Sequence, residues 1–370
     1  MIYLDYQATT PVAPEVAQAM RPWAEDHFAN PHSPSRWGRE AAAAIEVARD
    51  RVESATGLDG GSVAFTGSAT EAINWALRGT IERMSGRNRI VTIATEHAAV
   101  LDTCEWLEGQ GCELIRLPVG PDGLVELADV KAALDERVAM VAAMLVNNEI
   151  GVIQPVVEIT ALAHAVGALM LCDAVQGLGR VPIPEGPDLV AVSAHKIHGP
   201  KAIGALWMRA GAEPAPFLHG GGQERGLRSG TLSPALCVGF GMAAKLATEC
   251  RRGDHDHVER LWQAALAAVG PEWIVNGSVE QRYRGNLNIR RDGLDAARLI
   301  SDLRDIAFSL GSACASGSGR PSHVLRALGP DGQARSSIRL GFGRYTSEEE
   351  LVDAISRIDA AARAQQDIAA

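Results

Sequence analysis

Aromatic residues, paired cysteines, basic runs and long apolar runs are all scarce in this chain of 370 residues, of which 5% are Phe, Trp or Tyr. The six cysteines are scattered, which argues against both a disulfide framework and the paired spacing of a zinc site. The net charge is −10 and no block is rich in Lys or Arg, so we do not expect direct binding of nucleic acid. No signal peptide and no membrane-spanning apolar stretch is present, so a cytoplasmic protein is expected. From the cysteine spacing we expect no metal site.

The first two-thirds of the chain alternates short apolar runs with amphipathic stretches. The apolar runs have the length of strands, and the stretches between them have the periodicity of helices. Seven strands are predicted, at Ser62–Thr66, Arg89–Ala94, Glu113–Pro118, Ala139–Val146, Ala168–Cys172, Leu189–Ser193 and Ile203–Met208. The intervening helices are predicted at Arg39–Ala55, Thr70–Arg83, Val100–Glu108 and Val156–Val166. This alternation predicts an α/β fold with a mostly parallel sheet, whose ligands bind at the carboxyl ends of the strands.

The pattern changes after the glycine-rich stretch His219–Gly230. A long helix is predicted from Pro234 to about Arg251. Beyond it, helices are predicted at Asp254–Val269, Asp295–Asp302 and Ser347–Gln366, and strands at Trp273–Asn276, Asn286–Ile289 and Ser337–Leu340. We therefore predict a large domain over residues 12–250 and a small α+β domain that combines residues 1–11 with 251–370.

Two groups that suit pyridoxal 5'-phosphate (PLP) follow two of the predicted strands. Asp173 comes directly after the strand Ala168–Cys172, and Lys196 lies just beyond the strand Leu189–Ser193. A lysine amine can form a Schiff base with the cofactor, and a carboxylate can keep its ring nitrogen protonated. Gln176 lies one helical turn beyond Asp173. The sequence thus predicts a PLP site at the carboxyl edge of the sheet.

Other polar residues at strand ends fit the same site, and each has a simpler alternative. Ala69 and Thr70 open a helix whose N-terminus could bind a phosphate, although an ordinary helix start also explains them. His97 could stack on a flat ring and move protons, or it could be a structural histidine. Asn147 and Asn148 could bind a ring hydroxyl or a substrate carboxylate, or they could form a turn.

Three features nearer the C-terminus also carry chemistry. Thr231 ends a glycine-rich segment that could reach a phosphate or could be a flexible crossover. Cys314 lies in the glycine- and serine-rich segment Ser309–Gly319, which indicates a reactive thiol on a loop, or an incidental surface cysteine. Arg339 lies in a short apolar strand and requires an anionic partner, either a substrate carboxylate or a structural ion pair.

Taken together, these motifs resemble those of the cysteine desulfurases, the NifS/IscS-like PLP enzymes of the class-V aminotransferase family that mobilise sulfur for iron–sulfur clusters. The resemblance runs from Tyr3-Leu4-Asp5-Tyr6-Gln7-Ala8-Thr9-Thr10-Pro11 to Ser337-Ile338-Arg339. It is most specific at Val146–Gly151, His195–Lys201, Glu224–Thr231 and Gly311-Ser312-Ala313-Cys314. The Gly-Ser-Ala-Cys form is similar to the subgroup that serves nitrogenase and general cluster assembly.

The resemblance implies a fold-type I PLP-dependent transferase, with a seven-stranded mixed sheet, and a homodimer whose active sites lie at the subunit interface. It implies that Lys196 holds the cofactor, that Asp173 pairs with the ring nitrogen and that His97 stacks on the ring. Gln176 and Asn148 would bond the ring hydroxyl region. The phosphate would be bound by Ala69, Thr70, Ser193 and His195, and by Thr231 of the partner subunit.

The same resemblance implies the reaction and its partners. Arg339, with Asn147 or Asn148, would bind the carboxylate of L-cysteine. Cys314 would take the substrate sulfur as a persulfide, release L-alanine and pass the sulfur to an acceptor protein such as an iron–sulfur scaffold. The chain departs from the family pattern at Ala315, at Gly319-Arg320-Pro321 and at Thr66-Gly67-Ser68.

Two rival functions stay open from the sequence. One is a related PLP enzyme that acts on selenocysteine or cysteine sulfinate, for which a thiol nucleophile is not needed. The other is a non-catalytic relative that keeps the fold as a partner subunit. A Cys314→Ala variant separates the first rival from a cysteine desulfurase, and a Lys196→Ala variant tests the second.

Overall fold

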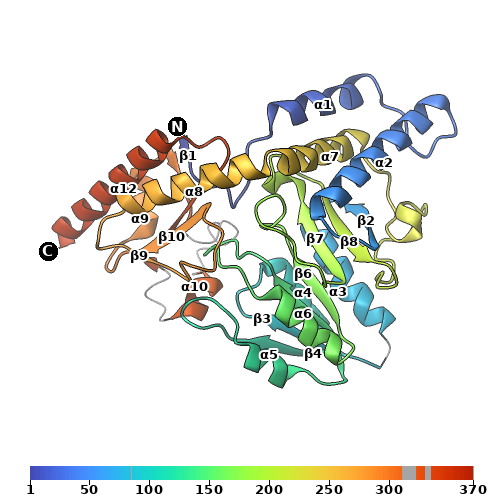
Figure 1. The fold of residues 1–370 in the computed structure, drawn as a ribbon, viewed down its shortest axis with the longest axis horizontal. Coiled ribbons are helices and arrows are strands. Elements are labelled where there is room, and N and C mark those ends of the chain that lie inside the picture. Colours follow the sequence, from blue (N-terminus) through green and yellow to red (C-terminus); the bar gives the residue numbers. More distant parts are fainter. Residues whose placement is uncertain (85, 311–321, 330–334, 370) are drawn as a thin grey trace.

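A seven-stranded sheet forms the larger part of the protein (Figure 1) in a computed structural model that describes residues 1–84, 86–310, 322–329 and 335–369. The strands are β2 (Gly61–Thr66), β3 (Arg89–Ile93), β4 (Glu113–Leu117), β5 (Val138–Met144), β6 (Leu169–Asp173), β7 (Leu189–Ser193) and β8 (Gly204–Arg209). Their spatial order is β2-β8-β7-β6-β5-β3-β4. Strand β8 runs in the direction opposite to the other six strands of this sheet, so it pairs antiparallel with both β2 and β7. The predicted mixed, mostly parallel sheet is therefore confirmed.

Helices cover both faces of the sheet because its strands are apolar on both sides. On β7, Val190 and Val192 join one buried cluster, whereas Leu189 and Ala191 join another, as the two-residue period of a strand requires. The first cluster includes residues of α1 (Pro14–Glu25), α2 (Arg36–Thr56), α5 (Leu127–Ala133), α6 (Val156–Ala165) and α7 (Pro234–Glu249). The second includes residues of α3 (Ala69–Arg83) and α4 (Ala98–Glu108).

The smaller part has its own apolar cluster and contains both chain termini (Figure 1). Its elements are β1 (Ile2–Tyr3), α8 (Arg251–Ala268), β9 (Ile274–Val275), β10 (Asn286–Arg290), α9 (Ala296–Asp302), β11 (Ile306–Ala307), α10 (His323–Leu328), β12 (Ser337–Gly341) and α12 (Glu348–Ala369). Strand β1 pairs with β11, and Leu4 belongs to the same buried cluster as Leu261 and Ile358. The N-terminal residues therefore pack against the C-terminal part of the chain, while the exact domain limits stay a prediction.

Several helices differ from the prediction. The helix predicted from Pro234 to Arg251 ends at Glu249, and α8 starts at Arg251 rather than at Asp254. Helix α1 was not predicted, because Pro22 inside it weakens the helical pattern, whereas Pro14 stands at its start, where proline is favoured. Helix α2 is longer than predicted. Over the described residues, no helix combines the length and apolar character needed to cross a bilayer.

Candidate active site

The polar residues of the site meet where the parallel strands of the sheet end. Strands β5, β6 and β7 are in parallel register, with Met144 beside Asp173 and Asp173 beside Ala191. Lys196 follows β7 within a short helical turn, η1 (Ala194–Lys196). The structure therefore brings the predicted amine and the predicted carboxylate to one edge of the sheet, as open α/β sheets do with their ligand-binding groups.

Asp173 is the buried acid of the site and is 5% exposed. One of its carboxylate oxygens, Oδ1, accepts a hydrogen bond of 2.9 Å from the Val175 N–H. Burial raises the pKa of Asp173 above its ordinary value, whereas the nearby His97, the Val175 N–H and Lys196 act in the opposite direction. A cation placed beside this carboxylate would favour its ionised form. The group is thus suited to a protonated ring nitrogen.

The Lys196 amine points at the N-terminal segment of the chain. Its Nζ atom donates to the carbonyl oxygens of Gln7 at 2.5 Å and Ala8 at 2.8 Å. Gln176 reaches the same place, since its Nε2 donates to the Gln7 carbonyl at 2.9 Å. The predicted pair Lys196 and Gln176 therefore shares an acceptor that the sequence analysis did not single out.

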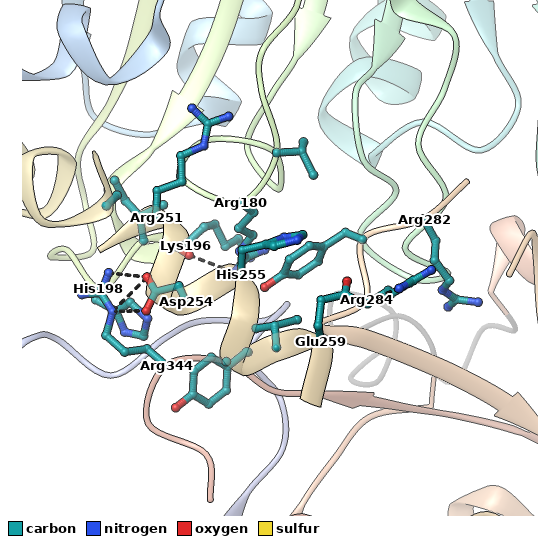
Figure 2. Close-up of a pocket in the computed structure, with 18 residues that line it drawn as sticks. Arg180, Lys196, His198, Arg251, Asp254, His255, Glu259, Arg282, Arg284 and Arg344 are labelled. Carbon is teal, nitrogen blue, oxygen red and sulfur yellow. Dashed lines mark hydrogen bonds and ion pairs between the residues drawn. The ribbon is translucent and has the colours of Figure 1, made fainter. Parts of the chain in front are cut away.

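Arg180 links the Lys196 turn to the Gln176 turn and was also missed by the sequence analysis. Its guanidinium donates to the Gln176 side chain and, at 2.8 Å, to the Lys196 carbonyl. Arg180 and Lys196 both line the pocket shown in Figure 2, which also contains the ion pair between Arg344 and Asp254 at 2.6 Å. In the sequence, Arg180 is a single arginine after a glycine. Nothing in that pattern distinguishes an arginine that joins two turns of a site from an exposed arginine.

The predicted phosphate residues lie around the start of α3. The Ser68 hydroxyl caps this helix by accepting from the Glu71 N–H at 3.2 Å. Ala69 and Thr70 are the first two helical residues, whose N–H groups have no acceptor within the helix. A Cβ atom on Gly204 would lie 2.5 Å from the Ala69 nitrogen, so only glycine allows β8 to pass this close. The helix start keeps the donors that a phosphate would need.

His195 and Ser193 belong to the same edge. Ser193 is the last residue of β7 and is 3% exposed. The Nδ1 atom of His195 lies 3.1 Å from the Thr9 hydroxyl. Burial, followed by the nearby Lys196, Lys201 and Arg180, lowers the pKa of His195 to about 4. Its ring is therefore neutral at pH 7 and can act as a hydrogen-bonding group.

His97 caps helix α4, and its neighbour Glu96 is an acid that the sequence analysis missed. The Ala99 N–H donates to His97 Nδ1 at 3.1 Å, so the proton of a neutral ring is on Nε2. Glu96 is fully buried, and its Oε1 accepts from the Met144 N–H at 2.6 Å. Burial and, next, Asp173 raise the pKa of Glu96 well above its ordinary value. Two carboxyl groups thus share the core beneath the site.

The two adjacent asparagines have different environments. Asn147 is 1% exposed; its Oδ1 accepts from the N–H groups of Glu149 at 2.8 Å and Ile150 at 3.0 Å, and its Nδ2 donates to the Thr95 carbonyl at 2.8 Å. Its side chain is therefore used within a turn, which was the alternative for this pair. Asn148 is half-buried, and its carbonyl accepts from Arg339 Nη1 at 3.0 Å.

Arg339 on β12 is 1% exposed and reaches this edge from the smaller part of the protein. Its Nη2 donates to Asp5 Oδ1 at 2.7 Å. The ion pair that the sequence left as one alternative is thus present. Arg339 also adjoins the carbonyl of Asn148, so the arginine predicted to bind a substrate carboxylate lies at the same site as Lys196 and the N-terminal segment.

Two predicted residues are not placed in this group. Thr231 is exposed just before α7, and in the described ranges no hydrogen bond joins it to Lys196, Asp173 or His195. Cys314 lies outside the described residues. Among the described residues, Ser309 forms two backbone hydrogen bonds with Arg339, and the Ser322 hydroxyl donates to Glu149, the neighbour of Asn148.

The chain matches the sequence pattern of the family described as "Aminotransferase class-V" over residues 2–354. The cysteine desulfurase IscS of Rickettsia bellii is 43% identical over 96% of this chain and 90% of that protein. A solved NifS-like protein superposes with a TM-score of 0.90 at 31% identity, over 97% of this chain and 99% of that one. SspA, solved in complex with cysteine, superposes with a TM-score of 0.82 at 31% identity, over 94% of this chain and 100% of that one. The chain therefore belongs to the class-V aminotransferases, a PLP-dependent family, and within them to the cysteine desulfurases.

Proposed function

We propose that this protein is a PLP-dependent cysteine desulfurase that converts L-cysteine to L-alanine and holds the sulfur on Cys314 as a persulfide. The observation that carries the proposal is the meeting of Lys196, Asp173 and Arg339 at one edge of the sheet, although they come from both parts of the protein. The relatives named above support the same reaction, and one of them was solved with cysteine.

The described residues fit PLP in charge and in geometry. Lys196 would hold the cofactor covalently, Asp173 would face the ring nitrogen and His97 would stack on the ring. Gln176 and Asn148 would bond the ring hydroxyl region. The start of α3 at Ala69 and Thr70, together with Ser193, His195 and Thr231, would bind the phosphate. When bound, the cofactor supplies an electron sink beside the substrate Cα.

The chain's own groups would then perform the remaining steps. Arg339 and Asn148 bind the substrate carboxylate, which orients the Cα–H bond. We assign this role to Asn148 rather than Asn147, because the Asn147 amide is used within its turn. Lys196 accepts the Cα proton and can return one to the product.

Cys314 supplies the nucleophile for sulfur transfer. Its thiolate attacks the substrate sulfur, so a sulfur–sulfur bond forms on Cys314 while the substrate bond between Cβ and sulfur breaks. The electron pair of the broken bond stays on carbon, which takes a proton to give L-alanine. No external oxidant or reductant is consumed. The persulfide sulfur then passes to an acceptor protein, such as an iron–sulfur scaffold.

A homodimer follows from the same proposal. Thr231 is exposed, and among the described residues no hydrogen bond joins it to His195 of its own chain, so we propose that it serves the site of the partner subunit. An exposed aromatic pair, Phe28 at 79% and Trp37 at 65%, lies with ring centres 6.3 Å apart and would be covered in the dimer.

All five described cysteines are free. A reducing cytoplasm would keep them and the Cys314 thiol in this form.

The direct test incubates the purified protein with L-cysteine and follows two products. L-Alanine should form, and mass spectrometry should find one added sulfur atom on the peptide that contains Cys314. Cys314→Ala should keep the yellow cofactor but yield neither product, and Lys196→Ala should lose the covalently held cofactor. Sulfide release from cysteine that persists in Cys314→Ala would instead support an enzyme that needs no thiol nucleophile.

A further inference from the structure

The N-terminal segment Asp5–Thr10 lies across the site and has no role in the proposal above. Its Gln7 and Ala8 carbonyls accept from Lys196, and its Thr9 hydroxyl lies beside His195. At its other end, the Asp5 carboxylate binds Arg339. One short segment therefore contacts both the amine that would hold the cofactor and the guanidinium that would hold the substrate.

The contact between Asp5 and Arg339 concerns the substrate directly. The Arg339 side chain is 1% exposed and the Asp5 side chain 18%, and the Nη2 and Oδ1 atoms lie 2.7 Å apart. The other terminal nitrogen, Nη1, donates to the Asn148 carbonyl at 3.0 Å. The guanidinium that should accept a substrate carboxylate thus already holds a carboxylate of the protein.

We propose that Asp5 sets the affinity of the site for amino acids by competing with the amino-acid carboxylate for Arg339. The inference rests on the proposed function, in which Arg339 binds that carboxylate. Before binding, Asp5 supplies the counter-charge that a buried guanidinium needs. On binding, the incoming carboxylate must displace Asp5 or lie beside its negative charge. Asp5 therefore lowers the affinity for every α-amino acid, which speeds the release of L-alanine.

The surrounding contacts allow this idea to be tested by removing only the charge. The Asp5 backbone is held by the Tyr3 hydroxyl, which donates to its carbonyl at 3.3 Å, and by a bridge to Gly341. The Arg339 backbone is held by two hydrogen bonds with Ser309, of 2.7 and 3.2 Å. Neither anchor uses the Asp5 carboxylate. An Asp5→Asn side chain has the same shape and keeps an acceptor for Nη2.

The experiment compares Asp5→Asn with a matched control, Asp359→Asn. Asp359 pairs with Arg291 at 3.0 Å, with side-chain exposures of 17% and 6%, and belongs to α12, away from the described site residues. L-Alanine is titrated into each holoenzyme, and its dissociation constant is read from the change in cofactor absorbance. The shift in melting temperature with L-alanine gives a second readout that needs no turnover.

We expect Asp5→Asn to bind L-alanine about tenfold more tightly than the unsubstituted protein, which corresponds to about 1.4 kcal/mol. KM for L-cysteine should fall with it, while kcat does not rise. Asp359→Asn should leave both affinities unchanged. In an Arg339→Gln background, Asp5→Asn should have no effect, since the two residues act through one contact.

Weaker or unchanged binding in Asp5→Asn would overturn the inference, because Asp5 would then only position Arg339 or be irrelevant to it. Equal effects of Asp5→Asn and Asp359→Asn would also overturn it. The proposed function fails separately: in that case the unsubstituted protein makes no L-alanine from L-cysteine. Formation of L-alanine together with an unaltered affinity in Asp5→Asn would reject the role of Asp5 alone.

Discussion

Replacement of Glu224 by alanine should destabilise the protein strongly, although Glu224 lies in the glycine-rich segment before Thr231. Its carboxylate accepts from Arg49 Nη1 at 2.7 Å, from Arg49 Nη2 at 2.8 Å and from the Phe65 N–H at 2.7 Å. The side chains of Glu224 and Arg49 are only 2% and 8% exposed. The contact joins the segment to helix α2 and strand β2 at once.

The size of the effect follows from this burial. Breaking a buried ion pair by removing one partner costs about 3–5 kcal/mol, because the other charge is left uncompensated. Arg49 would keep Glu46, whose side chain is 59% exposed, as a weaker partner. We therefore expect Glu224→Ala to cost about 3 kcal/mol in the free energy of unfolding.

The assay is urea denaturation followed by tryptophan fluorescence, with the midpoint and slope compared between variants. Glu25→Ala is the matched surface control: its pair with Arg21 has side-chain exposures of 59% and 74%, so the change should stay below about 1 kcal/mol. Glu224→Gln keeps the shape but removes the charge, and should fall between the two. A loss of less than about 1 kcal/mol in Glu224→Ala would refute the conclusion that this buried pair holds the segment.

Three further predictions test other parts of the structure. Burial lowers the pKa of His198 to about 4, so the folded protein binds fewer protons than the unfolded chain between pH 6.5 and 4. The free energy of unfolding should therefore fall as the pH drops through this window. In His198→Asn it should fall less steeply, and asparagine tolerates the φ of 66° found at this position. Equal slopes for the two proteins would contradict this prediction. Asn147→Ala removes three buried hydrogen bonds and should cost about 2–3 kcal/mol, measured by the same denaturation assay; a neutral effect would leave the Asn147 side chain free for the substrate. Serine at both Phe28 and Trp37 should shift the protein to a monomer in sedimentation experiments, and an unchanged dimer would place the interface elsewhere.

The fold was predictable where its signals are local. Most strands of the main sheet are short apolar runs, and polar residues follow β6 and β7 directly, so the positions of Asp173 and Lys196 could be predicted from neighbouring residues. Helix α1 was missed because Pro22 in its interior weakens its pattern. The turn role of Asn147 was one of two alternatives, since the same amide suits a turn and a ligand.

By itself, the sequence determined which elements form and which chemical groups follow each strand, because apolar periodicity and turn residues act over a few positions. Only the tertiary structure decided which groups meet. Asp5 and Arg339 are 334 positions apart in the chain, and Gln7 and Lys196 are 189 positions apart. Burial is likewise a property of the folded chain. Burial first, and then the nearby Asp173, raise the pKa of Glu96 well above its ordinary value.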